Sequence, residues 1–183
     1  MQLTARVIYD QLQKDQPEDG TELDLADHDL GYVCEFLSQS RGQAYEIVGR
    51  PDTHNRASSA PDYLVREDPS NRVIAVEHTR FMDQHLQAAK ARLIRQGADV
   101  ILIAPQSIDA QLVCSTLGSF LARKLARGQA ASVRADERWL IVRNRALASH
   151  RTFLSANIQL PVRAIQGVDH CYLIASRRLL AIW

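Results

Sequence analysis

The spacing of hydrophobic and polar residues alternates several times along the chain between a helical and an extended pattern. Apolar residues recur at three- and four-residue spacing in three stretches, residues 27–42, 83–96 and 107–127, and this spacing predicts helices. Short runs rich in β-branched and aliphatic residues predict strands at 44–50, 63–66, 73–79, 98–104 and 138–143. This order indicates a mixed α/β fold, a central sheet flanked by helices.

Residues that start or stop regular structure define the predicted boundaries. Asp27 or Asp29 is a suitable N-cap for the first long helix, and Gly42 suits the position directly after its C-terminus. Weak helical spacing over residues 3–13 predicts a short helix, and residues 171–183 have the pattern of a terminal hairpin. All 183 residues are expected to form a single domain.

The middle of the chain predicts a tight hairpin. The strands at 63–66 and 73–79 are separated by residues 68–71, Asp-Pro-Ser-Asn, which have strong turn chemistry. A four-residue loop here pairs Glu67 with Arg72 and defines the register of the two strands.

This register places two acids side by side. Asp62 stands opposite Glu77, and cross-strand partners have Cβ atoms roughly 5 Å apart. Like charges at that separation repel, so a divalent cation between them is expected. Because side chains alternate along a strand, Thr79 shares the face of Glu77 and His78 points away. We therefore expect His78 to be packed on the opposite face rather than to bind the same cation.

The same residues carry a resemblance to a known family. Pro61-Asp62, a hairpin-length gap and an apolar run ending in Glu77-His78-Thr79 resemble the motif of the PD-(D/E)XK nuclease superfamily. The resemblance covers about residues 27–143 and implies a restriction-endonuclease-like core, with the terminal hairpin outside it. It also implies that Asp62 and Glu77 bind Mg²⁺ or Mn²⁺. The motif lysine, expected two residues after the glutamate, is replaced by Thr79.

Two further residue types are implied by the resemblance. The helix before the first core strand often supplies an extra metal-binding glutamate in this superfamily, and Glu35 matches that place by order. The alternative is that Glu35 is a solvated helix acid. Some relatives move the catalytic lysine to a neighbouring helix. The chain has only three lysines, Lys14, Lys90 and Lys124, so few residues can take that role.

Lys124 is the first choice for the displaced lysine and Lys90 the second. Each falls within an apolar helical stripe, where an unpaired cation is costly to bury. A carboxylate or phosphate partner would relieve this cost. The alternative is that each side chain extends its ammonium group to solvent along an apolar stem.

Composition and charge narrow the class of protein. The 46% hydrophobic and 23% charged residues are ordinary for a globular protein, and no apolar run is long enough for a membrane helix. Three widely spaced cysteines suggest neither a disulfide framework nor a zinc site, which favours the cytoplasm. Residues 1–60 carry a net charge of −6, whereas residues 121–183 carry +8. This asymmetry serves either a polyanion surface or neutralisation between the two halves.

Together these features predict a metal-dependent endonuclease, a hydrolase of nucleic-acid phosphodiester bonds, with DNA as the favoured substrate. Arg80, Arg123 and Arg127 are the candidates for contacts with the phosphate backbone. No Walker A, GxSxG, HExxH or GxGxxG pattern is present. The alternative is a catalytically inactive nuclease-like fold that binds nucleic acid or protein. No membrane partner is expected, and whether the protein forms a homodimer is left open.

Overall fold

The computed structural model describes residues 2–4, 6–9, 22–51, 60–81, 95–96, 110–126, 133–144, 157–159, 167–175 and 178–182. The long helices are α1 (Glu22–Arg41) and α3 (Ala110–Ala126). The strands are β1 (Gln2–Thr4), β2 (Arg6–Tyr9), β3 (Ala44–Gly49), β4 (Tyr63–Asp68), β5 (Arg72–Phe81), β6 (Glu137–Asn144), β7 (Asn157–Gln159), β8 (His170–Ala175) and β9 (Arg178–Ala181).

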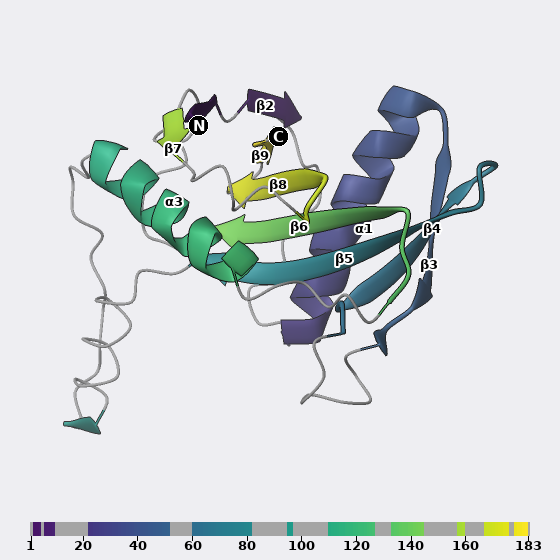
Figure 1. The fold of residues 1–183 in the computed structure, drawn as a ribbon, viewed down its shortest axis with the longest axis horizontal. Helices are drawn as coiled ribbons and strands as arrows, with labels where there is room; N and C mark the ends of the chain where they lie inside the picture. Colours follow the sequence, from purple (N-terminus) through teal and green to yellow (C-terminus); the bar gives the residue numbers. More distant parts are fainter. Residues whose placement is uncertain are drawn as a thin grey trace.

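Seven strands of the described chain form the main sheet, in the order β2-β9-β8-β6-β5-β4-β3, and β1 pairs with β7 separately. β3, β4 and β5 form an antiparallel meander, and β6 runs parallel to its neighbours β5 and β8. Helices α1 and α3 lie on opposite faces of this sheet (Figure 1). The prediction of a mixed α/β fold with helices on a central sheet is confirmed.

Helix α1 covers one face of the sheet with an apolar stripe. Leu30, Val33 and Leu37 recur at three- and four-residue spacing and are at most 3% exposed. Burying each such side chain contributes about 1.5–3 kcal/mol relative to exposure. Their partners in the core come from five strands: Tyr63, Val65, Ile74, Val76, Trp139, Ile141, Tyr172, Ile174 and Leu179.

The N-terminus of α1 differs from the prediction. The helix begins at Glu22, so neither Asp27 nor Asp29 caps it. Both lie inside the helix, and their carboxylates bond to side chains of the sheet and of Arg50, directly after β3, instead of to helix amides. The C-terminal prediction is confirmed, because α1 ends at Arg41 and Gly42 has a φ of 67°, which glycine adopts without a steric penalty.

The hairpin β4–β5 has the predicted register. Glu67 pairs with Arg72 and Tyr63 with Val76. Asn71 in the turn has a φ of 55°, a left-handed conformation that asparagine tolerates better than most residues. Local turn chemistry therefore determines which side chains of the two strands meet.

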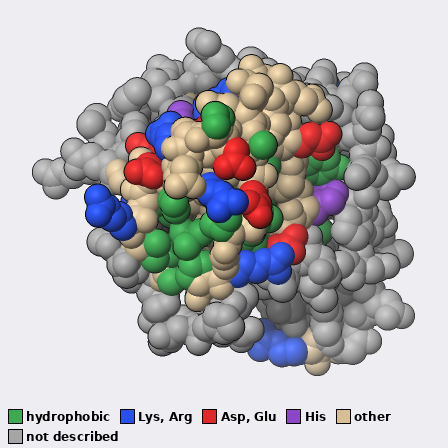
Figure 2. Space-filling model, turned by 90° about the vertical axis from the view of Figure 1, so that its right-hand side faces the viewer, with side chains coloured by type: hydrophobic (Ala, Val, Ile, Leu, Met, Phe, Trp, Pro, Cys, Tyr) green, Lys and Arg blue, Asp and Glu red, His purple; other side chains and the backbone are tan. Residues whose placement is uncertain are grey.

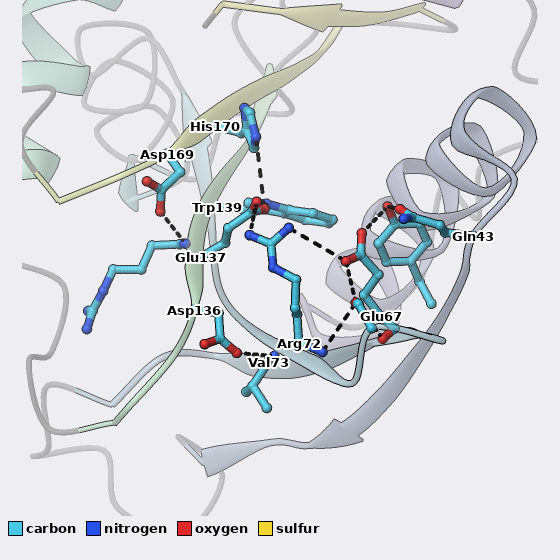
Figure 3. A network of polar contacts seen from close by, with 12 residues as sticks. Gln43, Glu67, Arg72, Val73, Asp136, Glu137, Trp139, Asp169 and His170 are labelled. Atoms are coloured by element: carbon cyan, nitrogen blue, oxygen red, sulfur yellow. Dashed lines mark hydrogen bonds and ion pairs between the residues drawn. The ribbon is translucent and has the colours of Figure 1, made fainter.

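The turn end of β5 is tied down by a network of polar contacts (Figure 3). Glu67 accepts hydrogen bonds from Tyr45 at 3.0 Å and from Ser70 at 2.7 Å, while Arg72 donates to Glu137 at 2.6 Å. Burial acts to raise the pKa of Glu67, but the Ser70 and Tyr45 hydrogen bonds outweigh it and hold that pKa below its ordinary value. The charges at this end of the sheet stabilise the fold.

An aspartate directly precedes each of the strands β6 and β8 and makes two hydrogen bonds to the neighbouring strand, one through its backbone amide and one through its carboxylate. The Asp136 amide donates to Val73 O at 2.7 Å, and the Asp136 carboxylate oxygen Oδ2 accepts from the Val73 amide at 2.8 Å. Asp169 does the same with Arg138, at 2.8 Å in both directions. These contacts help to align β5, β6 and β8, whose connections are too long to set the register locally.

The N-terminal prediction is wrong, because residues 2–4 and 6–9 form strands β1 and β2 rather than part of a helix. The Arg-Val-Ile-Tyr sequence of β2 suits a strand, and the edge of β9 supplies a pairing partner. The C-terminal hairpin is confirmed as β8 and β9. The predicted strand at 98–104 lies outside the described residues, as does the predicted helix at 83–96 apart from Arg95 and Gln96.

The opposite edge of the sheet, β3, lies on the side of the molecule where apolar side chains sit among charged ones (Figure 2). Ile47 and Val48 are 38% and 46% exposed there, and the pairing of β3 with β4 shifts register between Ile47 and Gly49. Such a bulge bends an edge strand and discourages pairing with other chains. No helix in the described part of the chain is both long and apolar enough for a membrane span.

Candidate functional site

The candidate site lies along β5, whose side chains alternate between the two faces of the sheet. Glu77 contacts α3, and the next residue, His78, contacts α1. The prediction that His78 points away from Glu77 is thereby confirmed. β5 has α1 on one face and α3 on the other, and each side carries its own cluster of charged groups.

Asp62 lies at the start of β4, directly before the first paired residue, Tyr63. The confirmed register, continued by one residue, places Asp62 opposite Glu77. Asp62 Oδ2 accepts a hydrogen bond from the backbone amide of His78 at 2.6 Å. This short bond holds the Asp62 carboxylate against β5 at His78, the residue directly after Glu77.

On the α3 side, Lys124 reaches the predicted acid. Leu117 and Leu121 of α3 are fully buried, and Lys124 follows three residues after Leu121 on the same stripe. The Lys124 Nζ lies 3.3 Å from Glu77 Oε1, with the two side chains 31% and 25% exposed. Of the two alternatives for this lysine, a carboxylate partner and a solvated ammonium group, the structure shows the partner.

On the α1 side, an aspartate, an arginine and a histidine meet in the interior. Asp29 is 0% exposed, and its Oδ1 accepts a hydrogen bond from Arg143 NH1 at 2.7 Å. Its Oδ2 lies 2.9 Å from His78 Nε2. The Arg143 guanidinium and the His78 ring thus contact the two oxygens of the same carboxylate. Arg143 is 3% exposed, so this cluster is closed to solvent.

The contacts on the two sides join at His78. Its ring is held by Asp29, and its backbone amide is held by Asp62. A continuous chain of polar contacts therefore runs from Arg143 on β6 through Asp29 on α1 and His78 on β5 to Asp62. Each link is 2.9 Å or shorter. The main chain at His78, beside Glu77, is consequently held by Asp62 directly and by Arg143 of β6 through Asp29 of α1.

A second carboxylate, partly exposed, lies two residues earlier on α1. Asp27 Oδ1 accepts from the Tyr63 hydroxyl at 2.8 Å, and Asp27 Oδ2 accepts from Arg50 at 2.6 Å. Arg50 also stacks over the Tyr63 ring, 5.7 Å from its centroid. Burial and the hydrogen bond to Asp27 raise the pKa of Tyr63 well above its ordinary value. These contacts fix the start of β4, where Asp62 lies.

Asp29 and Arg143 were missed as site residues by sequence reasoning. Asp29 lies four residues after Leu25 and four before Val33, both buried, so its place on the apolar stripe was a usable signal. The sequence pattern instead predicts that Asp29 is an N-cap, because aspartate is also common at that position. Arg143 ends a buried apolar run on β6, and nothing local indicates its partner 114 residues away.

The remaining predicted residues are not gathered at Glu77. Glu35 is exposed on α1 and accepts from Gln39 on the same helix at 3.4 Å. The described residues hold no group of three or more His, Cys, Asp or Glu side chains arranged to bind a metal, so Glu35 does not join the two acids. Arg80 pairs in register with Arg143 and shares the face of His78, opposite Glu77.

Arg123 is exposed on α3, next to Lys124 in sequence. Lys90 and Arg127 lie outside the described residues. Comparison of the chain with protein-family models, with curated proteins and with solved structures found no match.

Proposed function

We propose that the protein is a metal-dependent nuclease of the PD-(D/E)XK type. The observation that carries the proposal is the Lys124 ammonium group 3.3 Å from Glu77. Thr79, at the usual lysine position, cannot supply a positive charge. Lys124 comes from the helix between the meander and β6, so it brings a cation to the same acid from another element.

The order of elements supports the proposal. α1, the meander β3–β4–β5, α3 and then β6 parallel to β5 follow the order of a restriction-endonuclease-like core. The acid pair comes from the start of the second meander strand and from the third strand. β8, β9 and β2 extend the sheet on the far side of β6.

The residues present fit a magnesium ion. Mg²⁺ binds through one or two carboxylates together with phosphate oxygens of a substrate, and Asp62 and Glu77 supply two carboxylates. Lys124 already occupies a position against Glu77, so a positive charge is stabilised there. Mn²⁺ prefers the same oxygen ligands. When bound, the metal would polarise the scissile phosphate and lower the pKa of a bound water.

Each residue then has a separate role. Glu77 and Asp62 hold the metal, and the His78 amide orients the Asp62 carboxylate. Lys124 donates hydrogen bonds to the attacking water or to the phosphate oxygens as negative charge develops. Arg123 is exposed and directly precedes Lys124, so it is the candidate for contact with the substrate backbone, whereas Arg80 lies on the other face of β5. Contacts of this kind make binding fall steeply with salt concentration.

The test is cleavage of labelled single- and double-stranded DNA and RNA with Mg²⁺ or Mn²⁺. We expect metal-dependent cleavage that falls by about 10²-fold or more in Asp62→Asn, Glu77→Gln and Lys124→Met, the scale of losing one transition-state contact. Glu46→Gln is the matched control, because Glu46 is an exposed acid on β3 whose partner is Arg66. Equal cleavage by all four variants would contradict the proposal.

An inactive nuclease-like fold that binds nucleic acid is the second candidate, and one observation favours it. Glu77 has a cationic partner within the protein, so the acid pair does not require a metal for charge balance. The same assay distinguishes the two. Binding that is unaffected by metal, by Asp62→Asn and by Glu77→Gln, without any cleavage, would establish the binding module.

A further inference from the structure

We infer that Lys124 occupies the place of the metal on Glu77 and is released when the metal binds. The inference rests on the proposed function, since it concerns how the same two acids take up their cation. It adds a sequence of events to that function. The acid is first held by an internal ammonium group, the metal then replaces it, and the freed lysine becomes available to the substrate.

The geometry of the ion pair supports this exchange. Lys124 contacts Glu77 through one oxygen, Oε1, at 3.3 Å, a long distance for a charge-assisted hydrogen bond. Both side chains are a quarter to a third exposed, so water can solvate them when they separate. Exposed pairs of this kind are weak. Replacing this contact therefore costs little compared with the metal–carboxylate bond that forms.

The buried pair on the other side of β5 provides the contrast. Asp29 and Arg143 lie 2.7 Å apart and are at most 3% exposed. Separating them would leave uncompensated charges in the interior. That pair cannot exchange with an ion from solvent, whereas the Glu77–Lys124 pair can.

Metal and ammonium group cannot share the carboxylate in the same way. Mg²⁺ requires oxygen ligands at about 2.0–2.1 Å in near-octahedral geometry, and its double charge repels a neighbouring ammonium group. Lys124 remains attached to α3, whose Leu117 and Leu121 are fixed in the core. Its released ammonium group therefore stays within a side-chain length of Glu77. A substrate phosphate bound at the metal is the nearest new partner of matching charge.

The chain offers a direct test, because it has only three lysines. A brief pulse of an amine-acetylating reagent, followed by peptide mass spectrometry, reports the reactivity of Lys124 beside that of Lys14 and Lys90. We expect acetylation of Lys124 in the intact protein to rise several-fold when saturating Mg²⁺ is added. In Glu77→Gln it should be fast at the outset and independent of Mg²⁺, and Glu46→Gln should behave as the unsubstituted protein.

Calorimetric titration with Mg²⁺ on the same samples distinguishes failure of the lysine exchange from failure of the proposed nuclease function. Metal binding that is lost in Asp62→Asn, with no change in Lys124 reactivity, overturns the exchange and leaves the nuclease proposal standing. Absence of metal binding in the unsubstituted protein overturns both. If Mg²⁺ changes the reactivity of Lys90 and not that of Lys124, the lysine that responds to the metal is Lys90, and the inference is also overturned.

Discussion

The two sides of β5 carry charge clusters of opposite character. On the α1 side, Asp29 bonds Arg143 and His78 at 2.7 and 2.9 Å, and the Asp29 and Arg143 side chains are at most 3% exposed. On the α3 side, Glu77 and Lys124 lie 3.3 Å apart and are 25% and 31% exposed. Neighbouring residues of one strand thus take part in a closed network and in an open pair.

The difference in burial between the two sides indicates that one side stabilises the fold and that the other is accessible to a ligand. A buried, fully paired group cannot reach a substrate, and removing one partner leaves a charge in a low-dielectric interior. A partly exposed pair adds little stability but can exchange its partner. The α1 side therefore holds the strand in place, and the α3 side is where we propose that metal and phosphate bind. Substitutions on the two sides should consequently affect different measurements.

The largest expected effect on stability comes from Asp29→Ala. It removes the carboxylate that Arg143 and His78 share, and breaking a buried ion pair costs about 3–5 kcal/mol. Urea unfolding followed by circular dichroism measures this loss. Glu35→Ala on the exposed side of the same helix is the control, with an expected change within about 0.5 kcal/mol. If Asp29→Ala lowers the unfolding free energy by less than about 1 kcal/mol, the buried contacts on the α1 side contribute no more to stability than the exposed pair on the α3 side, and the comparison fails.

A smaller effect is expected from Tyr63→Phe, which removes the hydroxyl that donates to Asp27. One lost hydrogen bond of this kind costs about 1 kcal/mol. The pKa of Tyr63 is raised by burial and by the Asp27 bond, so the folded protein favours the neutral phenol. The corresponding stabilisation is complete below the ordinary value of 10.0 and is lost as the pH rises above it.

Unfolding free energy measured across this alkaline range tests the assignment. Tyr63→Phe should weaken the decline in stability with rising pH, although Tyr45 and Tyr172, whose pKa values burial also raises, continue to contribute. An identical alkaline decline in the variant and the unsubstituted protein would show that Tyr63 ionises equally readily in both states.

The smallest effect on stability is expected on the α3 side. Glu77→Gln, Lys124→Met and the double variant should each change the unfolding free energy by less than about 1 kcal/mol, with a coupling of the same small size. The proposed nuclease activity should nevertheless fall in all three variants. A coupling as large as that between Asp29 and Arg143 would mean that Lys124 is a structural residue, and the contrast between the two sides would disappear.

Local signals in the sequence predicted the parts of the site that depend on neighbours along the chain. The turn at residues 68–71 set the register that places Asp62 opposite Glu77. Strand alternation placed Glu77 and His78 on opposite faces, and helical spacing placed Lys124 on the buried stripe of α3. Each of these inferences needs only the geometry of one element or one short loop.

Other parts depend on how elements meet, and the sequence did not predict them. Asp29 was expected to cap a helix, and its contact with Arg143 depends on how α1 lies across β5 and β6. The N-terminal segment was expected to be helical, but residues 6–9 form a strand that pairs with the edge of β9. In both cases a partner distant in sequence outweighs a weak local preference.

The amino-acid sequence by itself determined the α/β class, the β4–β5 hairpin with its two acids, and the position of Lys124 on an apolar helix face. Only the tertiary structure decided that Lys124 meets Glu77 and that Asp29, His78 and Arg143 close the opposite side. The physical reason is the range of the interactions. Turn geometry and residue spacing act over a few residues, whereas pairing of charges across parallel strands and packed helices requires the whole sheet to be assembled.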